Sequence, residues 1–302
     1  MTKRVAITGS SGLIGGALRG ALTARGDTVL RVVRRPASSP EEIEWDPSAG
    51  RLDPTSLDEV DAVVNLAGVG IGDKRWDDEH KHAVEQSRLD STWTVSRALA
   101  DVHERTGRSI RLVNASAVGY YGDRGDEVLV EQSAPGTDFL SGVVTRWEAA
   151  ADPARAAGLP VAVARTGLVM APGSGAFKPL LLLARLGLGG PLGSGREWWP
   201  WITLVDEVNA LLHLVDHPEI TGPVNLVAPG DARQGDIARE LGRALSRPAL
   251  LPAPRVALRV VVGEFADSIL ASQRVEPQVL LDDGFTFEHP DLAGAVSWLV
   301  RS

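Results

Sequence analysis

A short apolar strand that runs directly into a glycine-rich turn constrains this chain more than any other feature. The stretch Val5-Ala-Ile-Thr-Gly-Ser-Ser-Gly-Leu-Ile-Gly15 places Gly9, Gly12 and Gly15 at the spacing G-x-x-G-x-x-G. The first glycine permits a tight turn, the second lets backbone approach a diphosphate, and the third lets helix pack on strand. N–H groups at the helix start then face the anion. The stretch predicts a dinucleotide-binding turn, with an ordinary strand-turn-helix corner as the alternative.

The residues that follow complete a βαβ unit. We expect a helix over 13–25 and a second strand over 28–33. Sites that prefer NAD usually carry an acidic residue at the end of this second strand. This chain has Arg34-Arg35-Pro36 there, and two guanidinium groups could fork onto a 2′-phosphate. We therefore expect NADP(H) rather than NAD(H); a solvated basic pair is the alternative.

Composition narrows the class of protein. With 302 residues, 44% of them hydrophobic and 23% charged, the chain can bury one large core or two unequal ones. A net charge of −8 argues against nucleic acid or anionic membrane as partners. Cysteine is absent, which excludes disulfides, thiolate metal sites and a thiol nucleophile. We expect a cytoplasmic protein with a small-molecule substrate and no signal peptide, and no oligomeric state is predicted.

Apolar runs that alternate with helical stretches indicate the fold class. Strands are expected over 60–68, 112–117, 161–167 and 223–228, with a long amphipathic segment over 77–104. This pattern predicts an α/β fold with a doubly wound parallel Rossmann sheet. Pro and Gly clusters at 171–175 and 187–195 mark excursions into a smaller C-terminal substrate lobe. We expect the Rossmann domain over 1–170, with 201–228 returning to the sheet, and the lobe over 171–200 and 229–302.

Several short motifs occur together along the chain. They are the glycine turn, Asn65-Leu-Ala-Gly68, Ser116-Ala-Val-Gly-Tyr-Tyr-Gly122, Trp147-Glu148, Arg165-Thr-Gly167, Gly189-Gly-Pro-Leu-Gly-Ser-Gly195 and Gly284-Phe-Thr-Phe287. In this combination the chain resembles the atypical extended short-chain dehydrogenase/reductases labelled nucleoside-diphosphate-sugar epimerase-like, which end in a small domain of unknown function. The resemblance implies an NADP(H)-binding Rossmann lobe with a C-terminal lobe over the nicotinamide.

The glycine turn, the resemblance and the strand ends together define the expected cofactor site, since ligands of such sheets lie beyond the carboxyl ends of the strands. Its expected members are Gly9, Ser10, Ser11, Gly12, Leu13, Ile14, Gly15, Arg34, Arg35, Asn65, Leu66, Ala67, Gly68, Arg88, Ser116, Arg165, Thr166 and Gly167. For Arg88, a solvated helix face is the alternative.

The chain departs from ordinary extended reductases at the proton-transfer site. Those relatives carry a Tyr and, four residues later, a Lys on the helix after the Ser-containing strand. Here that helix is expected over about 138–156, and it contains neither residue type. The usual Tyr-Lys pair therefore cannot operate in this protein. An arginine such as Arg146 could hold a ribose but could not shuttle a proton.

Four residues remain as candidates for catalysis. Ser116 could hydrogen-bond a carbonyl, with a loop cap as the alternative. Adjacent side chains are expected to point apart, so we expect Tyr121 as a pocket wall and Tyr120 as a proton donor, each with a structural role as the alternative. Glu148 is an acid/base candidate; an ion pair with Arg155 or Arg146 is the alternative.

The C-terminal lobe supplies candidate substrate residues. Trp198, Trp199 and Trp201 could line a pocket or could staple the lobe to the sheet. Lys178 could enter the site, although a surface position is more common. Relatives usually carry Gln where this chain has Glu197, and His where it has Thr203, so roles tied to those groups are in doubt.

Other chemistries find little support in the sequence. His213 and His217 share i,i+4 spacing, but no completing ligand set is evident, and we expect no metal site. The expected function is NADP(H)-dependent oxidoreductase or epimerase-like chemistry on a small organic substrate. The alternative is a non-catalytic redox sensor or scaffold that binds NADP(H).

Overall fold

The computed structural model describes residues 2–172 and 175–301, so Gly173 and Ser174 of the Pro/Gly-rich segment lie outside the described residues, as do both terminal residues. The chain divides into two compact units. The first unit is Met1–Ser116, Val143–Ala164 and Val208–Pro223; the second unit is Ala117–Gly142, Arg165–Glu207 and Val224–Ser302. Residues 117–142, which we expected in the Rossmann domain, thus group with the second unit. Each unit is described by itself below.

The main sheet has the strand order β11-β8-β6-β5-β1-β2-β3-β4. Pairing is parallel between β1 and β2, β1 and β5, β2 and β3, and β5 and β6, and antiparallel between β3 and β4. The chain winds from β1 in both directions, which confirms the expected doubly wound α/β class. The strands are β1 (Arg4–Thr8), β2 (Thr28–Val33), β3 (Glu42–Asp46), β4 (Arg51–Leu52), β5 (Ala62–Asn65), β6 (Arg111–Ala117), β8 (Val161–Thr166) and β11 (Gly222–Leu226).

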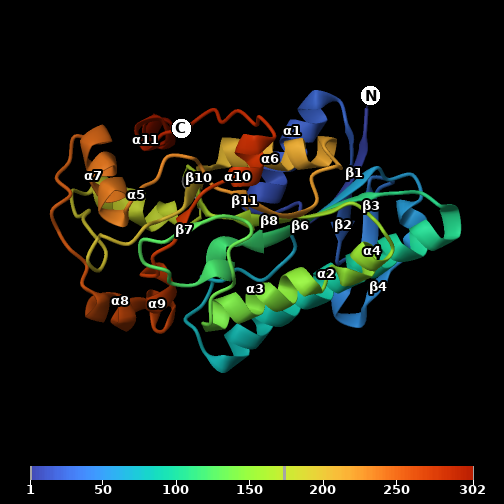
Figure 1. Cartoon of the computed structure of the whole chain (residues 1–302), viewed down its shortest axis with the longest axis horizontal. Coiled ribbons are helices and arrows are strands. Elements are labelled where there is room, and N and C mark those ends of the chain that lie inside the picture. The colour runs from blue at the N-terminus through green and yellow to red at the C-terminus, as the bar shows by residue number, and fades with distance from the viewer. Residues whose placement is uncertain (1, 173–174, 302) are drawn as a thin grey trace. The chain divides into compact units, whose positions relative to one another are not determined.

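In the first unit, α1 (Leu13–Arg25) covers one face of the sheet, and α2 (Asp78–Thr106) with α4 (Asp152–Ala156) covers the other (Figure 1). Helix α1 ends at Gly26, whose φ of 90° suits glycine. Asp77 is the N-cap residue of α2, and its carboxylate accepts a hydrogen bond from the His80 N–H at 2.7 Å. Short 3₁₀ turns lie at η1 (Pro47–Ala49) and η2 (Pro54–Leu57). Helix α6 (Leu204–Asp216) belongs mostly to this unit.

The prediction of a single helix over about 138–156 is wrong. The structure has two helices there, α3 (Phe139–Ala149) and α4. Pro153 stands in the first turn of α4. Proline has no N–H to donate to the carbonyl four residues earlier, so a continuous helix would lose a hydrogen bond and clash at that point.

The second unit holds two small parallel sheets and most of the short helices. The sheets pair β9 (Leu168–Met170) with β10 (Trp201–Thr203), and β7 (Val128–Leu129) with β12 (Arg274–Val275). Of residues 201–228, β11 therefore lies in the main sheet, whereas β10 pairs with β9. The helices are η3 (Val118–Tyr121), α5 (Phe177–Arg185), α7 (Gln234–Ala244), α8 (Arg255–Val262), α9 (Phe265–Ile269), α10 (Gln278–Asp282) and α11 (Leu292–Arg301).

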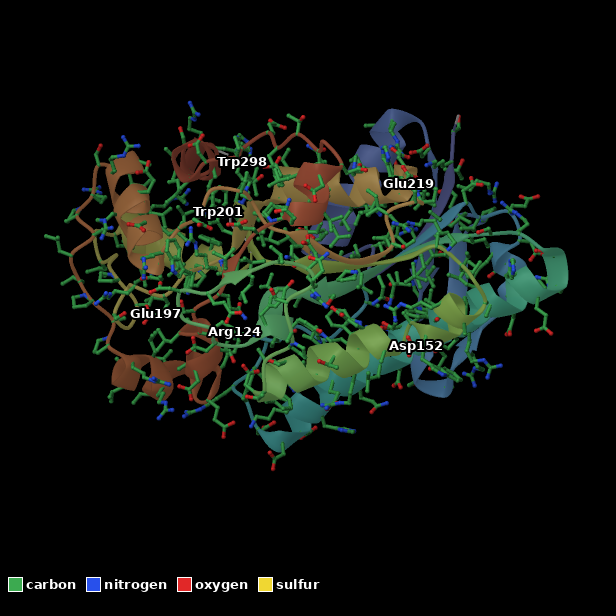
Figure 2. All side chains as sticks on the ribbon, viewed as in Figure 1. Arg124, Asp152, Glu197, Trp201, Glu219 and Trp298 are labelled. Carbon is green, nitrogen blue, oxygen red and sulfur yellow. The ribbon has the colours of Figure 1, made fainter. Side chains whose placement is uncertain are left out.

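Each unit encloses its own apolar core. The core of the first unit joins strand residues such as Val63 to Leu99 of α2 and Ala154 of α4. The core of the second unit packs Trp201 with residues of α5, α7 and α11, and Trp298 lies against it (Figure 2). Among the described residues, no helix combines the length and the apolar composition that crossing a membrane requires.

Candidate functional site

The glycine turn has the geometry that a diphosphate needs. Gly9 has a φ of 65°, and a Cβ there would lie 2.7 Å from the Leu66 carbonyl oxygen. Gly15 packs directly on the Gly9 backbone. Gly12 differs, because it is exposed and a Cβ there would meet only the Gly9 carbonyl oxygen, at 3.3 Å. Gly9 and Gly15 thus shape the turn, and the absence of a side chain at Gly12 leaves the exposed side of the turn open.

The start of α1 leaves its first N–H groups for a ligand. Gly12 is the N-cap residue, and it supplies no side-chain hydrogen bond to the helix. The first turn of α1 contains no acidic residue. The N–H groups of Leu13, Ile14 and Gly15 precede the first possible intrahelical acceptor. An anion is therefore the natural partner of these groups.

A buried polar cluster fixes the loop that follows β5. The Thr8 hydroxyl donates to Asn65 Oδ1 at 2.6 Å and accepts from the N–H groups of Leu66 and Ala67 at 3.0 and 3.1 Å. Asn65 also donates to Asn114 Oδ1 at 2.7 Å. The parallel register aligns Thr8 with Asn65 and Asn65 with Asn114, which confirms that β5 and β6 end at one sheet edge.

The sequence reasoning missed Thr8 and Asn114 as site residues. Both are fully buried polar residues in otherwise apolar strands. Buried polar groups need hydrogen-bond partners, so a polar residue that follows a run of apolar strand residues is the signal that could have found them.

Arg88 on α2 reaches the same loop. Its Nη1 donates to the carbonyls of Val69 and Val84 at 2.9 and 2.8 Å, and its guanidinium lies 5.0 Å from the centre of the Trp147 ring. Burial lowers the pKa of Arg88 to about 10. Gly68 lies against the Arg88 side chain. Arg88 therefore supports the loop, and the alternative of a solvated helix face does not describe it; its expected role in the cofactor site stays a prediction.

The two arginines after β2 differ in their surroundings. Arg34 is exposed and has no hydrogen bond or ion pair within the described residues. Arg35 forks onto Glu42, with 2.7 Å between Nη1 and Oε2. The hydrogen bonds from Arg35 and then Ser38 hold the pKa of Glu42 well below its usual range. Sequence reasoning missed Glu42, which is the first residue of β3.

Ser116 and Glu148, two of the catalytic candidates, form a pair in the first unit. The Ser116 hydroxyl donates to Glu148 Oε1 at 2.6 Å. Arg155 donates to the Glu148 backbone carbonyl and to Asp152, and Arg146 pairs with Glu85. A hydroxyl held by a carboxylate is an arrangement that can pass a proton.

Tyr120 and Tyr121 lie in the second unit, and the expectation that they point apart is wrong. Their rings meet edge to face with centroids 5.3 Å apart. The reason is local, since both belong to the 3₁₀ turn η3, which does not alternate its side chains as a strand does. The Arg165 guanidinium lies 3.5 Å from the centre of the Tyr120 ring and 5.2 Å from that of Tyr121.

The Tyr121 hydroxyl is enclosed in a hydrogen-bond network. It donates to Asn225 Oδ1 at 2.7 Å and accepts from Arg165 Nη1 at 3.0 Å. Glu131 Oε1 accepts from the Asn225 N–H at 3.0 Å. Burial raises the pKa of Tyr121 to about 12 and also raises the pKa of Glu131. By contrast, the half-buried Tyr120 has no hydrogen bond at its hydroxyl within the described residues.

Thr166 and Gly167 also lie in the second unit. The Thr166 hydroxyl donates to Glu207 Oε1 at 2.8 Å, and Glu207 Oε2 is buried without a hydrogen-bond partner in the described structure. Burial raises the pKa of Glu207 to about 8. A Cβ on Gly167 would lie 2.6 Å from the Pro200 carbonyl oxygen, so close packing requires this glycine.

The tryptophan-rich segment is mostly structural. Trp199 and Trp201 belong to the core of the second unit, and their indole N–H groups donate to the carbonyls of Ile269 and Gly230. Trp198 is half-buried, and the guanidinium of Arg233 lies 4.2 Å from the centre of its ring.

The space beside these tryptophans is small. A pocket lined by all three has a volume of about 10 Å³, which is room for about one water molecule.

The other three residues singled out in the C-terminal lobe are Lys178, Glu197 and Thr203. Lys178 is exposed on α5. Thr203 caps α6 by accepting from the Asp206 N–H at 3.1 Å, and Glu197 Oε1 accepts from the Ser194 hydroxyl at 2.8 Å. Thr203 therefore has a structural role in this chain.

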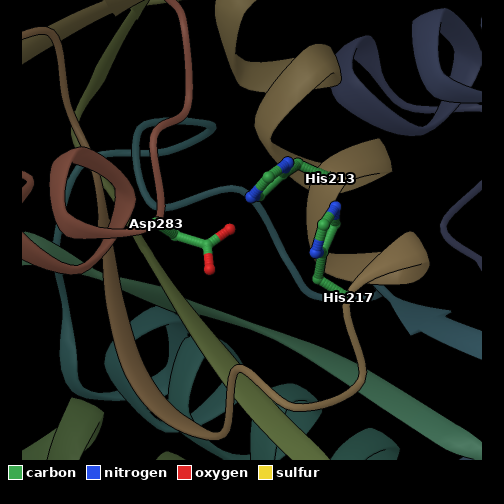
Figure 3. Close-up of side chains that lie close together, drawn as sticks. All are labelled: His213, His217 and Asp283. Atoms are coloured by element: carbon green, nitrogen blue, oxygen red, sulfur yellow. The ribbon is translucent and has the colours of Figure 1, made fainter.

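The histidine pair of α6 is stacked. The rings of His213 and His217 lie 4.1 Å apart at an angle of 24° (Figure 3). Figure 3 also labels Asp283, which belongs to the second unit.

Comparison with known proteins decides the family. A family model described as the NAD dependent epimerase/dehydratase family matches residues 5–226. The chain belongs to this family. A model described as a domain of unknown function matches residues 253–299, which include α8 to α10 and most of α11.

Relatives of the same family match over nearly their whole length. The epimerase family protein Mb2239 of Mycobacterium bovis is 44% identical over 97% of this chain and 96% of the relative. The epimerase family protein SDR39U1 of Homo sapiens is 36% identical over 98% of this chain and 99% of the relative. Both matches include the Rossmann segment and the C-terminal segment.

Solved structures agree in fold. The crystal structure of human SDR39U1 with NADPH matches with a TM-score of 0.87 at 34% identity, covering 99% of each chain. A nucleoside-diphosphate sugar epimerase from Corynebacterium glutamicum matches with a TM-score of 0.81 at 34% identity, covering 99% of this chain and 58% of that one.

Proposed function

We propose that this epimerase-family chain binds NADP(H) and catalyses an oxidoreductase or epimerase-like reaction on a small organic substrate. The observation that carries the proposal is the glycine turn at the start of α1 together with Arg34 and Arg35 at the end of β2. The turn offers N–H groups to a diphosphate. The arginines offer positive charge where an NAD-preferring site would carry a carboxylate.

The similar human structure supports the choice of cofactor. That human protein was crystallised with NADPH, and it matches this chain at 34% identity over 99% of each chain. The residues present here fit the same group, because the exposed guanidinium of Arg34 has no partner among the described residues and can bind a 2′-phosphate. When bound, the cofactor supplies or accepts a hydride; the protein orients it and handles the proton.

The Ser116–Glu148 pair is the proposed proton path. The Ser116 proton already lies on a 2.6 Å hydrogen bond to Glu148, so a lone pair of the hydroxyl oxygen remains for a substrate O–H. When a substrate alcohol is oxidised, Ser116 takes its proton and passes its own to Glu148. In the reverse direction, a protonated Glu148 returns the proton through Ser116 to the developing alkoxide. This path uses neither Tyr nor Lys.

Tyr120 is the second proposed donor. Its hydroxyl has no hydrogen bond in the described structure, whereas that of Tyr121 is enclosed by Asn225 and Arg165. Only a hydroxyl without a protein partner can be offered to a substrate at no cost in internal hydrogen bonds. We therefore propose a structural role for Tyr121 and the role of proton donor for Tyr120.

A small carbonyl compound or activated alkene is the proposed substrate class. Sugar-nucleotide epimerases of this superfamily depend on a Tyr that this chain lacks on α3 and α4. A Ser–Glu pair can protonate an alkoxide or enolate in a single step.

The test is turnover with NADPH. Purified protein is mixed with NADPH and a panel of carbonyls, enones and sugar nucleotides, and the absorbance of the reduced nicotinamide is followed. We expect oxidation with at least one carbonyl or enone. In that assay Glu148→Gln and Ser116→Ala should each lower kcat about 100-fold, because general acid–base groups contribute about 10²–10⁴. Glu44→Gln, a change of an exposed carboxylate on β3, is the matched control and should keep full activity.

A non-catalytic NADP(H) sensor or scaffold is the second candidate. The absence of the Tyr-Lys pair from α3 and α4 favours it. Tight NADPH binding without oxidation across the whole panel would support the sensor and overturn the catalytic proposal.

A further inference from the structure

Glu42 is a buried carboxylate beside the loop that carries Arg34 and Arg35. It is the first residue of β3 and lies directly opposite Arg31 of β2 in the parallel register. The Glu42 side chain has no exposed surface. A buried carboxylate is stable only when hydrogen-bond donors and positive charges surround it, and for Glu42 these come from β2 and from the loop itself.

Five donor atoms converge on the Glu42 carboxylate. Oε1 accepts from Nη2 of Arg31 and from Nη2 of Arg35, each at 2.5 Å. Oε2 accepts from Nη1 of Arg35 at 2.7 Å and from the N–H and hydroxyl of Ser38, both at 2.8 Å. Glu42 therefore ties together the two ends of the loop that begins at Arg34.

The same contacts leave one edge of Arg35 unused. A guanidinium has five N–H groups in a fixed plane. The end formed by Nη1 and Nη2 of Arg35 faces Glu42, and Nη1 also donates to Pro36 O and Ser38 Oγ. Within the described residues Nε has no acceptor. The edge formed by Nε and the second Nη2 hydrogen is a two-pronged donor, and the side chain is 52% exposed.

The local charge suits a doubly negative group. Arg31, Arg34 and Arg35 contribute three positive charges, and Glu42 removes one. Arg34 has no partner in the described structure. A terminal phosphate monoester carries close to two negative charges at neutral pH, and planar forks bind phosphate bidentately.

We propose that Glu42 is a positioning residue for cofactor choice: it holds the Nη1/Nη2 edge of the Arg35 guanidinium so that the adjacent edge, formed by Nε and Nη2, is fixed to bind the 2′-phosphate of NADP(H). This inference rests on the proposed function. Preorganising a long flexible side chain removes part of the entropy that binding would otherwise cost. The effect should therefore appear as selectivity between NADPH and NADH.

The test is calorimetric titration of the full chain and its Glu42→Gln variant with NADPH, NADH, adenosine 2′,5′-bisphosphate and 5′-AMP. Glutamine keeps the size of the side chain but places an N–H₂ group against the arginines. We expect NADPH and the bisphosphate to bind about tenfold more weakly to Glu42→Gln. Binding of NADH and 5′-AMP should stay within about twofold, which also shows that the variant is folded.

The matched control is Glu44→Gln, which removes a negative charge from the same strand at an exposed position. All four ligands should bind this variant as they bind wild type. Unchanged or tighter NADPH binding by Glu42→Gln would overturn the proposal, because it would show that Glu42 merely offsets positive charge.

Arg35→Lys tests whether the guanidinium fork of Arg35 binds the 2′-phosphate, whether or not Glu42→Gln folds. Lysine keeps the charge but has no fork, so the same selective loss for NADPH and the bisphosphate is expected. The double variant should lose no more than either single variant, since the two residues act as one unit; additive losses would contradict the proposal. Wild type that binds no NADPH at all would instead refute the proposed function itself.

Discussion

Two places in the molecule use their polar groups in opposite ways. At the start of α1 and after β2, both in the first unit, the first N–H groups of α1, Arg34 and the Nε edge of Arg35 have no acceptor among the described residues. In the second unit, Arg165 and Tyr121 bond to each other, to Glu131 O and to Asn225 within a buried network. Donors that lack acceptors indicate a place for a ligand, whereas donors with internal acceptors indicate a role in stability. The contrast supports the proposed cofactor site in the first unit and a structural role for the Arg165–Tyr121 network in the second unit.

The largest expected effect comes from closing the glycine turn. Gly12 has a φ of −74°, and a Cβ there would meet only Gly9 O at 3.3 Å, so Gly12→Val should fold. The valine would occupy the open side of the turn, and we expect calorimetry to show NADPH and NADH binding weakened on the order of a thousandfold or more. Gly20→Val is the matched control, since its Cβ meets nothing within 4 Å. Unaltered titration curves for Gly12→Val would place the diphosphate elsewhere.

Removing both arginines after β2 should separate the two cofactors. With Arg34→Ala and Arg35→Ala combined, NADPH should bind on the order of 30- to 100-fold more weakly, because two charge-assisted contacts to the 2′-phosphate are lost. NADH has no such phosphate and should bind almost as before. Equal losses for both cofactors would show that the pair acts on loop structure and not on the phosphate.

The buried carboxyl of the second unit should make stability depend on pH. Burial raises the pKa of Glu207 from 4.5 to about 8, so between these values the folded protein keeps a proton that the unfolded chain releases. The free energy of unfolding should therefore decline as pH rises through that window, by roughly 4 kcal/mol between pH 5 and pH 8.5. Urea denaturation at pH 5 and pH 8.5 measures it. Glu207→Gln should reduce the decline, whereas Glu44→Gln should not; identical pH profiles for wild type and Glu207→Gln would contradict this account.

The smallest expected effects are those of removing the hydroxyl of Tyr120 or of Tyr121. Tyr121→Phe should lower the free energy of unfolding by about 1–2 kcal/mol, because it removes the buried hydrogen bonds that the Tyr121 hydroxyl makes to Asn225 Oδ1 and Arg165 Nη1. Tyr120→Phe should leave stability unchanged, since its hydroxyl makes no hydrogen bond in the described structure, but should lower turnover if Tyr120 donates a proton. Thermal unfolding and NADPH oxidation measured on both variants check this; the reverse pattern would exchange the two roles.

The sequence predicted the elements whose signals are local. The observed bounds of α1 and β2 are those expected, because the glycine turn, Gly26 and the β-branched run mark them directly. Pro153 is equally visible in the sequence, yet the expected single helix did not take account of it, and the break between α3 and α4 was missed. The candidate residues Ser116 and Glu148 were each identifiable from motifs.

The pairings within the site were not predictable in the same way. Ser116 and Glu148 are 32 positions apart, and nothing in their local patterns encodes their contact. Glu42 appeared as one charge among many, since burial of a carboxylate depends on how β3 pairs with β2. The geometry of Tyr120 and Tyr121 followed from a 3₁₀ turn that no local pattern distinguished from an extended segment.

The claim on which the account depends is that the first unit binds NADP(H) in preference to NAD(H). Calorimetric titration of the purified wild-type chain with NADPH and with NADH, in the same buffer and salt, tests it most directly. The account predicts one site per chain that binds NADPH more tightly than NADH. Absence of binding by either cofactor, or equal or tighter binding of NADH, would contradict it.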